Sequence, residues 1–197
     1  MQKFKKINNF IFNIDTIDLL VIEIVSVIAI MIQLILHEIP CPLCILQRIG
    51  ILAIGFLYIL NLKFKPSIVN YVLIILTAIS TASISLRQIL LHIVPGTGSF
   101  GSDFLGYHLY TWVFIFSLLT ILWNLIKLLI FHIFAGNQNI SKPVWIRRVI
   151  NFLIVFYVII VISNMISLLF ECGLNYSCPS EPDKYLLLEN YQKNYHL

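Results

Sequence analysis

The chain has 197 residues, of which 59% are hydrophobic and only 11% are charged, and its mean hydropathy is +0.93. Soluble globular domains contain about 25% charged residues, so this composition excludes a soluble domain and predicts an integral protein of the lipid bilayer. The formal net charge of +4 is interpreted as a signal of membrane orientation, and no nucleic-acid partner is inferred from it.

Five apolar windows are long enough to cross a hydrocarbon core of about 30 Å, which takes roughly 20 helical residues. They cover residues 19–36, 45–62, 68–94, 109–131 and 149–170. None shows the alternation of a membrane strand, so the predicted fold class is an all-α membrane protein, a four-helix transmembrane bundle plus a fifth transmembrane helix. Asp15 and Asp18 precede the first window and no small-residue cleavage pattern follows it, so we expect that window to stay in the membrane.

Basic residues predict the orientation of these crossings. With five crossings, one side of the membrane receives most of them: Lys3, Lys5, Lys6, Lys63, Lys65, Lys127, Lys142, Arg147 and Arg148. The positive-inside rule then places the N-terminus in the cytoplasm and the C-terminus outside. The expected segments are a cytoplasmic N-terminal stretch (1–18), a four-helix bundle (19–131), a cytoplasmic connection (132–148), a fifth helix (149–170) and an external tail (171–197).

The four cysteines form two pairs. Cys41 and Cys44 lie between the first two windows, and Cys172 and Cys178 follow the fifth. Five crossings place both pairs outside, which suits an oxidising compartment such as a bacterial periplasm. A zinc site and two structural disulfides are alternatives. A pair separated by two residues closes almost no loop entropy and is a poor structural staple, so a redox-active pair is favoured and no metal site is predicted.

The second helix is expected to begin at the first cysteine pair. Pro42 suits the first helical turn. Cys44 then lies near the third helical position, where unpaired N–H groups favour a thiolate. Arg48 follows one turn later on the same face, and Arg87 approaches the same external side from the third window. Each arginine either extends to lipid headgroups or lines a pocket for a polar-headed, lipid-soluble ligand, and a quinone head group fits.

Other polar residues near the external side are candidate ligand contacts. Gln33 and His92 lie at the ends of the first and third windows and are candidates for binding the ligand. Tyr110 and Trp112, at the start of the fourth, are predicted to be membrane-interface anchors. Residues 95–108 are predicted to be a flexible external connection, and the end of the tail an amphipathic surface helix.

The run Cys41-Pro-Leu-Cys44-Ile-Leu-Gln-Arg48 after a first membrane helix resembles the motif of the DsbB family of bacterial inner-membrane thiol oxidases. The resemblance covers the first four helices. It implies that Cys44 faces a bound quinone (ubiquinone or menaquinone) and that Arg48 stabilises the reduced form. The resemblance also implies that Arg87 corresponds to the arginine that the family has in its third helix. In well-known members the second cysteine pair lies between helices three and four, whereas residues 95–108 contain none here.

The resulting hypothesis is a thiol:quinone oxidoreductase of the bacterial inner membrane. A reduced, DsbA-like thiol oxidase of the periplasm would attack a Cys172–Cys178 disulfide, the new thiols would reduce Cys41–Cys44, and the electrons would enter the membrane quinone pool. The quinone-binding residues would be Cys44, Arg48, Arg87, Gln33 and His92. Two alternatives remain: electron flow in the reducing direction, as in vitamin K epoxide reductase-like proteins, and a non-enzymatic membrane scaffold with structural disulfides.

Overall fold

The computed structural model describes residues 2–36, 40–64, 66–93, 103–134 and 144–172. These residues form five long helices: α1 (Gln2–Leu36), α2 (Pro42–Lys63), α3 (Ile68–Leu91), α4 (Leu109–Phe134) and α5 (Val144–Cys172). Each is long and apolar enough to cross a membrane. The predicted fold class, an all-α membrane protein with five spanning helices, is confirmed.

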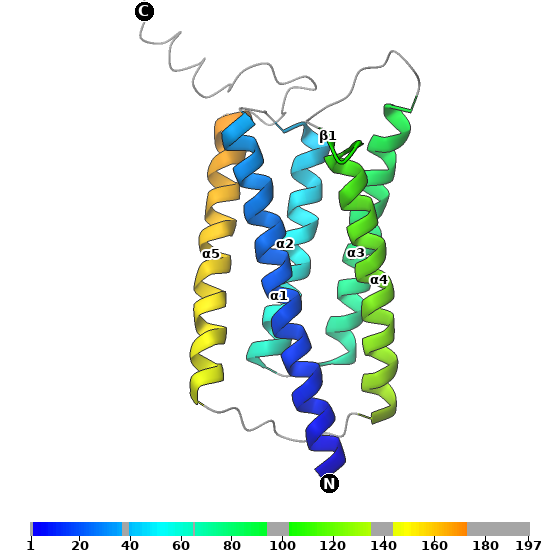
Figure 1. Ribbon diagram of the computed structural model, residues 1–197, viewed down its shortest axis with the longest axis vertical. Coiled ribbons are helices and arrows are strands. Elements are labelled where there is room, and N and C mark those ends of the chain that lie inside the picture. The colour runs from blue at the N-terminus through cyan, green and yellow to red at the C-terminus, as the bar shows by residue number, and fades with distance from the viewer. Residues whose placement is uncertain (1, 37–39, 65, 94–102, 135–143, 173–197) are drawn as a thin grey trace, which may run out of the picture.

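The helices run alongside one another, with α5 at one side of the bundle and α3 and α4 at the other (Figure 1). α3 packs against α4 and α2, α1 packs against α2, and α5 packs against α1 and α2. The beginning of α2 and the end of α5 lie at the same end of the bundle (Figure 1), so Cys41 and Cys172 lie at that end too. This is the arrangement that five crossings require.

A short antiparallel hairpin lies at the cysteine end of the bundle. Its strands are β1 (Asp103–Phe104) and β2 (Tyr107–His108), and Asp103 and His108 are register partners whose side chains are in contact. Leu105 and Gly106 between the strands both have positive φ, the backbone geometry of a tight two-residue hairpin turn. The sequence had predicted a flexible connection over this part of residues 95–108.

The first helix begins at Gln2, well before the window that starts at residue 19. The expected segment 1–18 does not end at a structural break, since residues 2–18 continue into the membrane-spanning part of α1, which starts at Phe10. The physical reason is that Asp15 and Asp18 are paired inside the bundle. Their partner is Lys127, which the sequence had counted among the loop charges and which is only 2% exposed.

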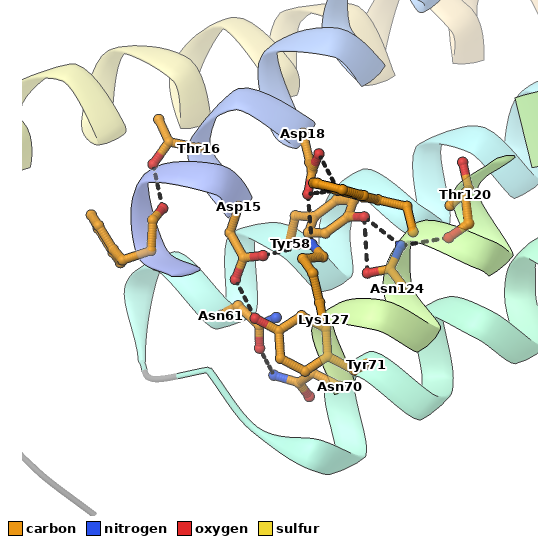
Figure 2. A network of polar contacts seen from close by, with 12 residues as sticks. Asp15, Thr16, Asp18, Tyr58, Asn61, Asn70, Tyr71, Thr120, Asn124 and Lys127 are labelled. Carbon is orange, nitrogen blue, oxygen red and sulfur yellow. Dashed lines mark hydrogen bonds and ion pairs between the residues drawn. The ribbon is translucent and has the colours of Figure 1, made fainter. Parts of the chain in front are cut away.

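This buried ionic network joins four helices at the end opposite the cysteines (Figure 2). Lys127 Nζ on α4 lies 2.8 Å from Asp15 Oδ1 and 2.6 Å from Asp18 Oδ2, both on α1. The Tyr71 hydroxyl on α3 donates to Asp15 Oδ2 at 2.8 Å. The ammonium also lies 4.5 Å from the ring centroid of Tyr58 on α2 and 5.1 Å from that of Tyr71. Contacts from other helices thereby offset the desolvation cost of burying each charge.

Gly55 on α2 allows α1 and α5 to approach closely. A Cβ at this position would lie 2.8 Å from Tyr157 Cε2 on α5 and 2.9 Å from Ile22 Cγ2 on α1. The Tyr157 hydroxyl donates to the Leu52 carbonyl on α2. Small residues at helix contacts let backbones approach where lipid supplies no hydrophobic driving force. The fifth helix is therefore fixed to the bundle by shape and by a hydrogen bond.

We predict that Lys127→Met strongly destabilises the fold. The substitution keeps the length of the side chain but leaves Asp15, which is fully buried, without its cation. Breaking a buried ion pair by removing one partner costs about 3–5 kcal/mol. Unfolding by denaturing detergent in mixed micelles, followed by circular dichroism, would measure the change. Lys63→Met, at an exposed position at the end of α2, is the matched control, and equal stability of the two variants would contradict the pairing.

Candidate functional site

Cys41 is the N-cap of α2, and its sulfur receives the hydrogen bonds offered by the start of that helix. Its backbone is extended (φ −72°, ψ 161°), Pro42 occupies the first turn, and the Cys44 N–H donates to Cys41 Sγ at 3.3 Å. Both cysteines are free thiols, with 2.9 Å between their sulfur atoms. The sequence had assigned the helix N-terminal donors to Cys44. The structure gives them to Cys41, because the first free N–H groups of a helix point back at the cap residue.

Gln88 on α3 contacts both sulfurs. Its Nε2 lies 3.2 Å from Cys41 Sγ and 3.4 Å from Cys44 Sγ, and its Oε1 accepts from Gln47 Nε2 at 2.7 Å. Gln88 is fully buried. Sequence reasoning assigned it no role and chose its neighbour Arg87 instead. The sequence could have predicted that Gln88 is buried, because it continues the buried face of α3 at the same helical spacing.

These contacts favour the thiolate form of Cys41. The hydrogen bond from the Cys44 thiol, with smaller contributions from the backbone N–H groups of Cys44 and Leu43 and from the Gln88 amide, outweighs burial and lowers the pKa of Cys41 to about 6. Cys41 is therefore the member of the pair that is favoured as a reactive thiolate at neutral pH.

A cavity of about 400 Å³ opens beside the two cysteines, between α1, α2, α4 and the hairpin. Its walls are mostly apolar and include the rings of Phe104, Trp112 and Phe116. The polar or ionisable side chains in the walls are few: Gln33, Cys41, Cys44, Gln47, Arg48 and Tyr110. A volume of this size, with apolar walls and a few polar groups, is typical of a site for a small organic ligand.

Arg48 lies in the cavity wall and is held there by α1. Its Nη1 donates to Gln33 Oε1 at 2.6 Å, and its Nη2 donates to the Ala29 carbonyl at 3.2 Å. These contacts favour a place in the cavity wall over extension of the side chain to lipid headgroups. The predicted candidates Cys44, Arg48 and Gln33 are thus brought together at one cavity.

Two other predicted ligand contacts lie outside this cavity. Arg87 is exposed, and it does not line the cavity. Successive helical residues are about 100° apart, so turning Gln88 toward the sulfurs turns Arg87 away. His92 is the half-buried C-cap of α3 and does not line the cavity either. The ring centroid of His92 lies 5.9 Å from that of Tyr110. Tyr110 and Trp112, which were predicted to be membrane-interface anchors, both line the cavity.

Cys172 is the last residue of α5, and it is buried and disulfide-bonded. The predicted partner Cys178 lies outside the described residues, as does the predicted tail helix. The preceding residue, Glu171, is also buried, and its Oε1 accepts from Gln33 Nε2 at 2.8 Å. The end of α5 thus contacts a residue that lines the cavity.

Comparison with known proteins finds similarity in the first half of the chain. Residues 17–100 match the family model described as disulfide bond formation protein DsbB. A similar curated protein, disulfide bond formation protein B of Chromobacterium violaceum, is 45% identical over 64 residues, which are 30% of this chain and 39% of the relative. The chain thus matches less than half the length of that relative. No solved structure matches the chain.

We predict that the reactivity of Cys41 with a thiol-alkylating reagent rises with pH around a midpoint near 6. Only the thiolate reacts, and a pKa lowered to about 6 means that the thiolate is present above that pH and is lost as pH falls through it. Rates of alkylation of the reduced protein between pH 4 and 9, with peptide mapping to separate Cys41 from Cys44, would measure the profile. The control is Gln88→Leu, which removes one donor and is expected to raise the midpoint. A wild-type midpoint above 8 would contradict the assignment.

Proposed function

We propose that this protein is a member of the DsbB family, whose model residues 17–100 match, and that it is a membrane thiol:quinone oxidoreductase. It would reoxidise a DsbA-like thiol oxidase and pass the electrons to a membrane quinone. The observation that carries the proposal is the free Cys41–Cys44 pair, with its sulfurs 2.9 Å apart in the wall of a cavity that also contains Arg48.

The residues of the cavity fit a quinone head group. Aromatic and aliphatic walls suit a flat, lipid-soluble ring, and the guanidinium of Arg48 suits oxygens that gain negative charge. Cys44, Arg48 and Gln33 would hold the head group, whether ubiquinone or menaquinone. When bound, a quinone supplies an acceptor for two electrons and two protons.

The chain's own residues prepare the thiol pair for oxidation. The Cys41 thiolate can supply an electron pair for a new bond to Cys44 Sγ, while the Cys44 thiol gives up its proton. The pair thereby loses two electrons and, because Cys41 is already deprotonated, one proton. Gln88 donates to both sulfurs and so holds them together as the disulfide forms.

The second cysteine pair supplies the donor side of this proposal. The thiols of a reduced, DsbA-like protein would attack the disulfide that contains Cys172, and the released tail thiols would then reduce Cys41–Cys44 through a mixed disulfide. The start of α2, which Cys41 precedes, and the end of α5, which is Cys172, lie at the same end of the bundle (Figure 1), which supports this transfer. We further propose that this end faces the periplasm of a bacterial inner membrane and that the N-terminus is cytoplasmic.

Purified protein in detergent, mixed with a reduced DsbA-like oxidase and a short-chain ubiquinone, is expected to consume quinone, as followed by ultraviolet absorbance. Cys44→Ala and Cys41→Ala should abolish consumption, because each removes one member of the pair. Cys172→Ala should abolish consumption driven by the oxidase but spare that driven by a small dithiol. Net reduction of the oxidase by the reduced quinone would instead support the reducing direction. If no electrons are transferred in either direction, the non-enzymatic membrane scaffold is the alternative that remains.

The two arginines provide a matched pair of variants for the acceptor site. We predict that Arg48→Ala raises the KM for quinone by about tenfold or more, as expected for loss of a charged hydrogen-bond donor. Arg87→Ala is expected to change it by less than about twofold, because Arg87 lies outside the cavity. Steady-state kinetics with quinone as the varied substrate would measure both, and equal effects would refute the assignment of the cavity.

A further inference from the structure

A single amide on α1 joins the arginine of the cavity to the end of α5. Gln33 Oε1 accepts from Arg48 Nη1 at 2.6 Å. At the other end of the same amide, Gln33 Nε2 donates to Ser167 Oγ and to Glu171 Oε1, each at 2.8 Å. Ser167 also donates to Glu171 Oε1 at 2.9 Å. We call these four residues the Gln33 bridge.

The chemistry of the bridge determines which way the Gln33 amide points. A guanidinium has only N–H donors, so it needs the amide oxygen, and Glu171 Oε1, which also accepts from Ser167, needs the amide nitrogen. With Arg48 on one side and Glu171 on the other, one orientation satisfies both. Without Glu171 and Ser167, the amide could rotate and present its NH₂ group to Arg48, which would break the Arg48–Gln33 hydrogen bond.

Burial argues that Glu171 does more than attach α5 to the bundle. Its side chain is 2% exposed, and its Oε2 has no hydrogen-bond partner among the described residues. An acid at that position is costly in a membrane bundle. Along the rest of the same face, α5 packs with the apolar side chains of Ile150, Leu153 and Ile160, so packing alone does not call for a carboxyl group.

We propose that Glu171 and Ser167 are positioning residues of the acceptor site, which fix the Gln33 amide and thereby hold the Arg48 guanidinium at the cavity wall. The inference rests on the proposed function, because it assigns these residues to the binding of the quinone head group. Neither residue lines the cavity, so both act through Gln33. The fifth helix, which lies outside the region that matches the family, then contributes to the acceptor side as well as carrying Cys172.

The test compares Ser167→Ala, Glu171→Ala and Glu171→Gln with the control Ser163→Ala. Ser163 is on the same helix, but its hydroxyl donates to the Ile159 carbonyl of that helix. Binding of a short-chain ubiquinone to the oxidised protein, in which no turnover occurs, is measured by quenching of tryptophan fluorescence, since Trp112 lines the cavity. The KM for quinone and the kcat are measured separately, and helical circular dichroism checks the fold.

We expect Glu171→Ala and Ser167→Ala to weaken quinone binding and raise its KM by about three- to tenfold, the effect of losing one buried hydrogen bond. Glu171→Gln should restore binding to within about twofold of wild type, because its amide oxygen can still accept from Gln33. Ser163→Ala should have no effect. The rate of Cys41 alkylation should stay unchanged in all four, which separates positioning of Arg48 from general disruption.

The outcomes that overturn the inference differ from those that overturn the proposed function. If wild-type protein neither binds nor reduces quinone, both fail. If wild-type protein does both and Glu171→Ala matches it, only the inference fails. It also fails if Ser163→Ala and Glu171→Gln weaken binding as much as Glu171→Ala, since that pattern indicates helix packing. Should Glu171→Ala not fold, Ser167→Ala and Glu171→Gln still decide between these results.

Discussion

The structure depends on pairing charged and polar side chains inside the membrane bundle with protein partners, because lipid offers no hydrogen bonds. At one end this requirement joins α1 to α4 through Lys127 and Asp15 (Figure 2). At the other it joins α2 to α1 through Arg48 and Gln33. Apolar contacts between helices could slide with little loss, since lipid tails are equally apolar. The buried charges cannot slide, so they fix which helices meet and at what level.

The same requirement shapes the thiol pair. The start of α2 has unpaired N–H groups and points into the end of the bundle, so an acceptor at its N-cap is favoured, and Cys41 Sγ takes that place. Gln88 supplies the further donor from α3. The result is an asymmetry within a pair of identical residues, in which the cap sulfur is stabilised as a thiolate and Cys44 lies one turn inside. The capping of the start of α2 and the thiolate character of Cys41 therefore have the same cause.

Composition was enough to predict the five helices, and spacing was enough to predict that Cys41, Cys44 and Arg48 lie close together. The structure places Gln88 beside the sulfurs and leaves Arg87 exposed, a difference that follows from the helical phase of α3. The buried face of α3 recurs every three or four residues and reaches Gln88: Tyr71, Ile74, Ala78, Thr81, Ser85 and Gln88. The pairing of Asp15 with Lys127 could not be predicted, because it joins residues 112 positions apart and depends on how α1 and α4 pack.

The fifth helix has a buried face with the same periodicity, and the side chains on that face change from mainly apolar to polar toward its end. Ile150, Leu153, Tyr157 and Ile160 are buried on one face, and Ser167 and Glu171 continue that spacing to the cysteine end. The face is thus apolar where it needs only to pack, and polar where it meets the Gln33 amide. A helix that merely returned the chain across the membrane would not require this change. The contact with Gln33 explains why Ser167 and Glu171 occur in the last turns of the helix.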